Sequence, residues 1–260
     1  MAGEIFAGET ERERDAAASY KLPQITLVFW VLKIAATTLG ETGGDLLAQT
    51  MKVGYLASSA ILVSLFAVSL VAQLRSRRFH PALYWTVILS TSTAGTTMSD
   101  FLNRTAGLGY FRGMVLLLGC LGVVFAVWKA SGHPFDVAGV TTFRAEVLYW
   151  TAILFSNTLG TSLGDFLADD THLGFGGGAL LISGLIALIV VARYTTRIST
   201  TLLFWTAFVL TRPLGATTGD FFSKPVSHGG LGYGTIGASA ILAAALIILI
   251  THQTRRPATP

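Results

Sequence analysis

Cysteine is almost absent from this 260-residue sequence, which contains Cys120 alone. A single cysteine cannot form an intramolecular disulfide, and no cluster of Cys and His has the spacing of a zinc site. Charged residues are also scarce, at 12% of the chain against about 25% in soluble domains. Since 52% of the residues are apolar, much of the surface is expected to face something other than water.

The sequence contains eight long apolar segments. Each is about long enough to cross a hydrocarbon layer of about 30 Å as a helix. A helix is expected because lipid offers no hydrogen-bond partners to backbone N–H and C=O groups, which a helix pairs internally. The segments cover residues 23–47, 53–74, 81–102, 108–128, 147–167, 175–192, 200–222 and 233–251. The sequence therefore predicts an all-α integral membrane protein with eight transmembrane helices. Residues 1–20 are polar and lack the pattern of a signal peptide, so we expect a cytoplasmic tail there.

The segments form four copies of one two-helix repeat. In each copy a tryptophan precedes an aspartate by 15 residues, and a glycine precedes the same aspartate by five. The aspartates are Asp45, Asp100, Asp165 and Asp220; the tryptophans are Trp30, Trp85, Trp150 and Trp205; the glycines are Gly40, Gly95, Gly160 and Gly215. An apolar–Gly–aromatic step follows each aspartate. Four matches at the same offsets define an internal repeat, with the tryptophans and glycines as its structural anchors. The tryptophans are expected either to anchor the helices at the membrane surface or to pack.

The repeat boundaries and the basic residues predict how the chain is arranged. We place repeat one at residues 21–78, repeat two with a linker at 79–143, repeat three at 144–197 and repeat four at 198–256. Twelve Lys and Arg residues lie in the tail and in the connections between repeats or after the last one. Four lie in the loops within repeats: Lys52, Arg104, Arg112 and Lys224. This bias places both termini in the cytoplasm of a cell-membrane protein. Two helices per repeat give all repeats one orientation, and hence pseudo-symmetry about the membrane normal.

This pattern resembles a family of bacterial integral membrane proteins made of four tandem two-helix repeats of unknown function, each with a characteristic tryptophan. The resemblance covers residues 21–256, with Trp30, Trp85, Trp150 and Trp205 at the tryptophan position. It implies the eight-span architecture and a bacterial inner-membrane location. It implies no activity.

Reading back from each aspartate in steps of four residues gives a polar stripe on one helix face. The candidate ion-binding residues on these stripes are Glu41, Asp45, Asp100, Asp165, Asp220, Thr37, Thr96, Asn157 and Thr161. Within them, Glu41 and Asp45 are the predicted metal ligands. Lys33 and Arg212 are expected to neutralise part of this charge, Lys33 paired with Glu41 or Asp45 and Arg212 paired with an aspartate. Five carboxylates against two cations leave an excess of three negative charges.

Carboxylates at membrane depth are costly and mark functional sites. With Thr and Asn oxygens they form a hard site that suits Mg²⁺, Ca²⁺, Mn²⁺ or protons. The sequence therefore predicts a permease for a small cation, with lipid as its surroundings and with no cofactor and no nucleic-acid partner. One alternative is a membrane scaffold or sensor whose aspartates only cap helices. Another is a membrane-embedded enzyme, although no nucleophile–base set is present, so no enzyme activity is expected. Pro213 is expected to kink or break its helix.

Overall fold

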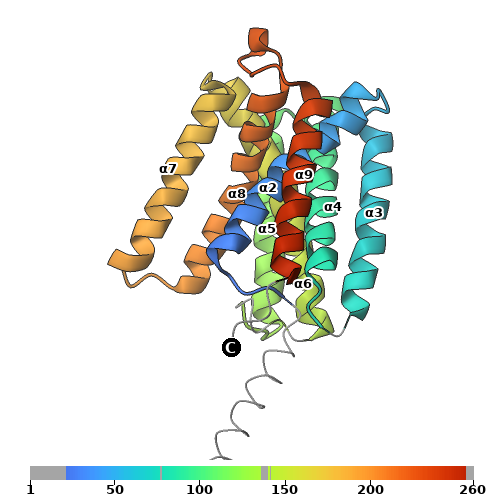
Figure 1. The fold of residues 1–260 in the computed structure, drawn as a ribbon. Coiled ribbons are helices and arrows are strands. Elements are labelled where there is room, and N and C mark those ends of the chain that lie inside the picture. Colours follow the sequence, from blue (N-terminus) through green and yellow to red (C-terminus); the bar gives the residue numbers. More distant parts are fainter. Residues whose placement is uncertain (1–21, 77, 136–139, 141, 256–260) are drawn as a thin grey trace, which may run out of the picture.

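The computed structural model describes residues 22–76, 78–135, 140 and 142–255 (Figure 1). The predicted tail at 1–20 and part of the predicted linker lie outside these residues. In the described part the chain forms eight long α-helices and no strand. They are α2 (Leu27–Asp45), α3 (Tyr55–Arg75), α4 (Pro81–Asp100), α5 (Tyr110–Ala130), α6 (Phe143–Asp165), α7 (Gly174–Thr195), α8 (Thr200–Ser223) and α9 (Gly234–Arg255). The all-helical prediction is confirmed.

The first helix of every repeat belongs to a closed inner ring. Helix α2 packs against α4 and α8, and α6 packs against the same two helices from the other side. Each second helix lies outside this ring, on the inner helix of the following repeat. Thus α3 covers α4, α5 covers α6, α7 covers α8, and α9 returns to cover α2 (Figure 1). The last repeat therefore closes the ring over the first.

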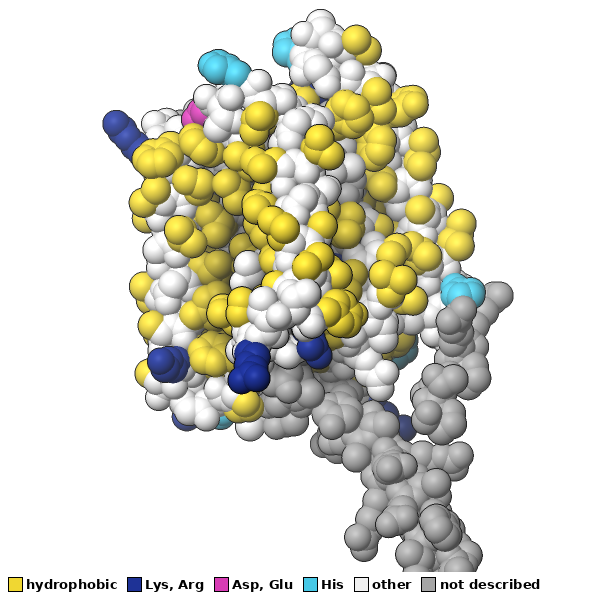
Figure 2. Space-filling model, turned by 90° about the vertical axis from the view of Figure 1, so that its left-hand side faces the viewer, with side chains coloured by type: hydrophobic (Ala, Val, Ile, Leu, Met, Phe, Trp, Pro, Cys, Tyr) yellow, Lys and Arg dark blue, Asp and Glu magenta, His cyan; other side chains and the backbone are white. Residues whose placement is uncertain are grey.

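The outer helices carry the apolar surface. Among the described residues, four helices are long and apolar enough to cross a membrane: α3, α5, α7 and α9. Helix α7 is the least covered, with 11% of its most apolar window buried. Figure 2 shows hydrophobic side chains along one face of the molecule, with charged side chains only near its two ends. This surface is that of a membrane protein, because water would not solvate it.

The repeat glycines allow the inner helices to approach one another closely. A Cβ added to Gly40 would lie 2.4 Å from the Cβ of Ser92, and one added to Gly215 would lie 2.5 Å from the Oγ1 of Thr37. Both neighbours stand eight residues before the aspartate of the next repeat around the ring. Gly95 and Gly160 meet the equivalent positions, Asn157 and Arg212. Small residues at such crossings are the usual means of tight helix packing in membranes.

The inner helices of the first three repeats do not end at the aspartate. Each continues as a five-residue π-helical turn, which covers Leu46–Thr50, Phe101–Thr105 or Phe166–Asp170. The turn leads to a glycine with positive φ at Gly54, Gly109 or Gly174, which explains the glycine of the apolar–Gly–aromatic step.

Repeat four differs from the others. Helix α8 remains α-helical to Ser223, and a short 3₁₀ helix follows at Val226–His228. Ten residues separate Asp45 from Tyr55, whereas thirteen separate Asp220 from Tyr233. Helix α8 also runs through Pro213 without a break, so of the expected kink or break the break does not occur. The seam between repeats four and one is therefore unlike the other three.

Candidate functional site

The polar stripes of the four inner helices converge on the axis of the ring. Residues at matching offsets form successive layers along it, because every fourth residue of a helix returns to the same face. The aspartate layer contains Asp45, Asp100, Asp165 and Asp220, and the next layer contains Glu41, Thr96, Thr161 and Ala216. Below these lie Thr37, Ser92, Asn157 and Arg212, and then Lys33, Ile88, Ile153 and Phe208. Every one of these side chains is buried.

Arg212 joins all four inner helices through one nitrogen. Its Nη2 lies 2.8 Å from the Oε2 of Glu41, and it also donates hydrogen bonds to the hydroxyls of Thr96 and Thr161. The same nitrogen donates to the carbonyl of Ser92 at 3.4 Å. The predicted aspartate partner is wrong, because Asp220 lies two turns along α8 whereas Glu41 lies one layer away. The candidate ligands Thr96 and Thr161 therefore surround the Arg212–Glu41 ion pair.

Lys33 is fully buried without an ion pair to any described residue. Its Nζ lies 3.5 Å from the Oδ1 of Asn157 and 4.2 Å from the centre of the Phe208 ring. The predicted pairing with Glu41 or Asp45 is wrong. Glu41 stands eight positions after Lys33 in α2, and eight helical residues rise by about 12 Å.

The two remaining candidate ligands without charge, Thr37 and Asn157, lie in the third layer and form hydrogen bonds within the protein. The hydroxyl of Thr37 donates to carbonyls of α2 and, at 3.2 Å, to that of Thr211 in α8. The amide nitrogen of Asn157 donates to Thr91 at 2.7 Å. Both side chains thus connect inner helices to one another.

The aspartates form two pairs, each bridged by a cation. Lys224 Nζ pairs with Asp45 and, at 3.4 Å, with Asp220. On the opposite side Arg104 pairs with Asp100 at 3.0 Å and with Asp165 at 3.8 Å. Each cation thus connects an aspartate of its own repeat with one of the next repeat around the ring.

The capping alternative does not describe these carboxylates. The side chains of Asp45, Asp100 and Asp165 form no capping hydrogen bond with the π-helical turns that follow them. Asp45 and Asp165 instead pair with cations across the seams between repeats, whereas Asp100 pairs with Arg104 of its own turn. The side chain of Asp45 also accepts a hydrogen bond from Gln49 in the turn that follows it.

Arg104 and Lys224 change the charge count of the interior. Five carboxylates now face four cations (Lys33, Arg104, Arg212 and Lys224), which leaves an excess of one negative charge and not three. Sequence reasoning assigned both residues to loops. The signal that it missed is their position four residues after an aspartate, the spacing of an ion pair within a helix.

Lys224 lies beyond the end of α8, where burial and charge act in opposite directions. Burial alone would lower the pKa of Lys224, but the carboxylates of Asp220 and Asp45 raise it above its usual value. The ammonium therefore keeps its charge beside these two aspartates at neutral pH.

Three carboxylates converge where repeats one and four meet. Ligand oxygens of Glu41, Asp45 and Asp220 lie within 4.8 Å of one another, and all three residues are buried. The predicted ligand pair thus gains Asp220 from α8, while Asp100 and Asp165 belong to the other bridged pair. Such a spacing fits oxygens on the coordination sphere of one hard cation, whose bonds are about 2.0–2.6 Å long.

Aromatic side chains close the opposite end of the axis. The hydroxyls of Tyr84 and Tyr149 lie 2.8 Å apart, and Phe29 and Phe204 occupy the equivalent positions on α2 and α8. The tryptophans pack around this layer: Trp85, Trp150 and Trp205 are buried, and Trp30 is partly buried. The sequence left open whether they anchor the protein at the membrane surface or pack; three of the four pack inside.

A family model described as Repeat of Unknown Function (DUF347) matches residues 28–79, 83–133, 148–199 and 203–259. The chain belongs to this repeat family. Its four matched copies correspond to the four helix pairs of the ring. Neither a curated protein nor a solved structure gives a significant match, so the site of this DUF347 protein has to be interpreted from its own residues.

The ion pair at the centre predicts a large effect on stability. Arg212→Met leaves Glu41 buried without its cation, which should lower the free energy of unfolding by about 3–5 kcal/mol. The matched control is Arg193→Met, on the exposed end of α7. Thermal unfolding in detergent should show a markedly lower unfolding temperature for Arg212→Met and an unchanged one for Arg193→Met. Equal stability of the two variants would contradict the central role of the pair.

Proposed function

We propose that this protein is an eight-span membrane permease for a small, hard cation (Mn²⁺, Mg²⁺, Ca²⁺ or a proton), with both termini in the cytoplasm. The apolar outer helices support membrane insertion, and their inner partners reach the same depth because the two sets pack side by side. Repeats in one orientation around one axis are a known plan of transporters. The basic residues of the sequence support the orientation.

The proposed orientation can be tested by labelling. In a Cys120→Ala background, Asp170→Cys and Val226→Cys should react with an impermeant thiol reagent added outside intact cells, because both positions are exposed at the carboxylate end. Arg197→Cys, exposed at the other end, should react only after permeabilisation. The reverse pattern would overturn the orientation.

The observation that carries the proposed function is the convergence of Glu41, Asp45 and Asp220 inside the bundle. Three buried carboxylates are unfavourable in a purely structural core, and ionisable groups at membrane depth are usually part of an ion or proton path. Their oxygens suit Mn²⁺, Mg²⁺ or Ca²⁺ better than soft metals. The aromatic layer of Tyr84 and Tyr149 closes the far end, so a cation would reach these carboxylates from the outer side in this conformation.

A membrane scaffold is the second candidate. It is favoured by one observation, the near balance of charge in the interior, where Arg104 and Lys224 bridge all four aspartates. A scaffold needs these ion pairs only for stability. A permease needs at least one of the carboxylate groups to exchange its partner for a cation.

Flux measurements separate the two candidates. Proteoliposomes with the wild-type protein should take up Mn²⁺, and Glu41→Gln/Asp45→Asn should abolish uptake because it removes two of the three ligands. The matched control is Asp169→Asn/Asp170→Asn, which alters two exposed carboxylates of the outer loop and should leave uptake unchanged. Undiminished flux in the first double variant would refute the permease, whereas loss of folding in it can be recognised from its unfolding temperature.

A further inference from the structure

Lys224 occupies the position that a bound cation would need. Its Nζ is in contact with Asp45 and Asp220, two of the three converging carboxylates, and its side chain is 18% exposed. The aspartates beside it are 2% and 5% exposed. An ammonium held by two buried carboxylates is, in electrostatic terms, a cation tethered to the protein.

Arg104, the equivalent residue of repeat two, is held in a different way. It lies within a π-helical turn, and its guanidinium faces the Tyr110 ring at 5.6 Å and the hydroxyl of Tyr55 at 3.5 Å in addition to its two aspartates. Lys224 follows the last residue of α8 in extended backbone, with φ −71° and ψ 153°. Among the described residues no aromatic ring covers its ammonium. Lys224 thus lacks the aromatic contacts of Arg104; besides its two aspartates, its Nζ donates to the Oε1 of Gln49 at 3.4 Å.

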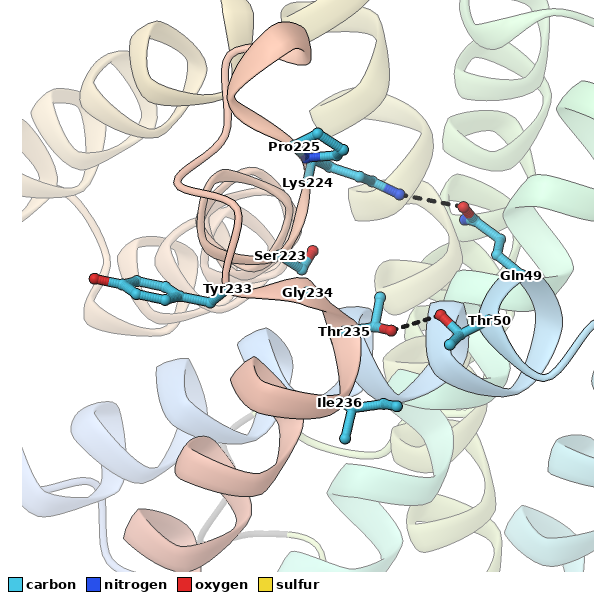
Figure 3. A pocket seen from close by; sticks show the side chains of 9 residues that line it. All are labelled: Gln49, Thr50, Ser223, Lys224, Pro225, Tyr233, Gly234, Thr235 and Ile236. Atoms are coloured by element: carbon cyan, nitrogen blue, oxygen red, sulfur yellow. Dashed lines mark hydrogen bonds between the residues drawn. The ribbon is translucent and has the colours of Figure 1, made fainter.

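A cavity of about 480 Å³ lies beside Lys224, at the seam where repeat four meets repeat one. Figure 3 shows Lys224, Gln49 and Thr235 around this space, with the hydroxyl of Ser223 pointing into it. Ser223 is 4% exposed, and its Oγ has no hydrogen-bond partner among the described residues. A buried hydroxyl without a partner is costly unless something binds it. The cavity therefore offers room for the lysine and a hydroxyl oxygen that can accept a hydrogen bond from its ammonium.

We propose that Lys224 is a built-in competitor for the cation site, which leaves Asp45 and Asp220 and turns into the cavity when a cation binds. The cation then takes the two aspartates, with Glu41 close by. This inference rests on the proposed function, since it describes how the same carboxylate site is regulated. A tethered competitor keeps the carboxylates paired when no cation is present, which avoids unpaired charge in the interior.

Binding of Mn²⁺ to the purified protein in detergent, followed by electron paramagnetic resonance, tests this inference. Lys224→Met removes the competitor and should lower the Kd for Mn²⁺ about tenfold or more. A tenfold change in Kd corresponds to about 1.4 kcal/mol of binding free energy. The matched control Arg104→Met removes a charge from the equivalent position of the other aspartate pair and should bind Mn²⁺ much as the wild type does. Lys224→Arg, which keeps a tethered charge, should not gain affinity.

The outcomes distinguish the two proposals. If Glu41→Gln/Asp45→Asn loses Mn²⁺ while Lys224→Met binds it no better than the wild type, the competitor role is overturned and the cation site stands. If neither the wild type nor Lys224→Met binds Mn²⁺, both proposals fall. An equal gain in Arg104→Met also overturns the competitor role, because it reveals only a general effect of charge.

A measurement on the unmodified protein gives an independent test in case a variant does not fold. An amine-reactive reagent should modify Lys224 faster when Mn²⁺ is present, because the displaced ammonium has lost its carboxylate partners. Mass spectrometry of the Lys224 peptide follows this rate, with exposed Lys52 as the internal reference. An unchanged or slower rate in Mn²⁺ would contradict the inference.

Discussion

The buried ion pair between Arg212 and Glu41 is the constraint on which the rest of the interior depends. A guanidinium cannot lose its proton, so its burial is tolerated only with a carboxylate and further hydrogen-bond acceptors within reach. Thr96 and Thr161 supply them from the other two inner helices. The repeat glycines bring these helices close enough for one nitrogen to reach all of them. Packing and electrostatics thus fix the same arrangement.

The four-fold plan is broken where chemistry is expected. Repeat one contributes Glu41, and repeat four contributes Arg212, Lys224 and a longer loop in place of a π-helical turn. These two repeats meet at one seam, because α9 closes the ring over α2. Repeats two and three keep the regular form, with Arg104 held by two aspartates, the hydroxyl of Tyr55 and the ring of Tyr110. A symmetric scaffold can hold a single specialised site in this way, with three seams devoted to stability.

Much of this fold follows from the sequence, and the reasons for the misses are physical. Apolar segment lengths predicted the eight helices, and the recurrence of Trp30 and Asp45 in later copies predicted the repeats. Hydropathy does not indicate which neighbour an apolar helix packs against. The packing of each outer helix on the inner helix of the next repeat therefore could not be predicted from the sequence. The π-helical turn returns Arg104 to its aspartate, although the sequence pattern placed it in a loop. The partner of Arg212 depended on the relative height of two helices, which spacing along one chain does not define.

We propose that the carboxylates of repeats one and four hold a cation in exchange for Lys224. An experimental structure of crystals grown with Mn²⁺ tests that claim most directly, through the anomalous scattering of the metal. We expect one anomalous peak between Glu41, Asp45 and Asp220, with the Lys224 side chain turned into the cavity beside Ser223. A structure from the same crystals with no peak there, and with Lys224 still bridging Asp45 and Asp220, would contradict it.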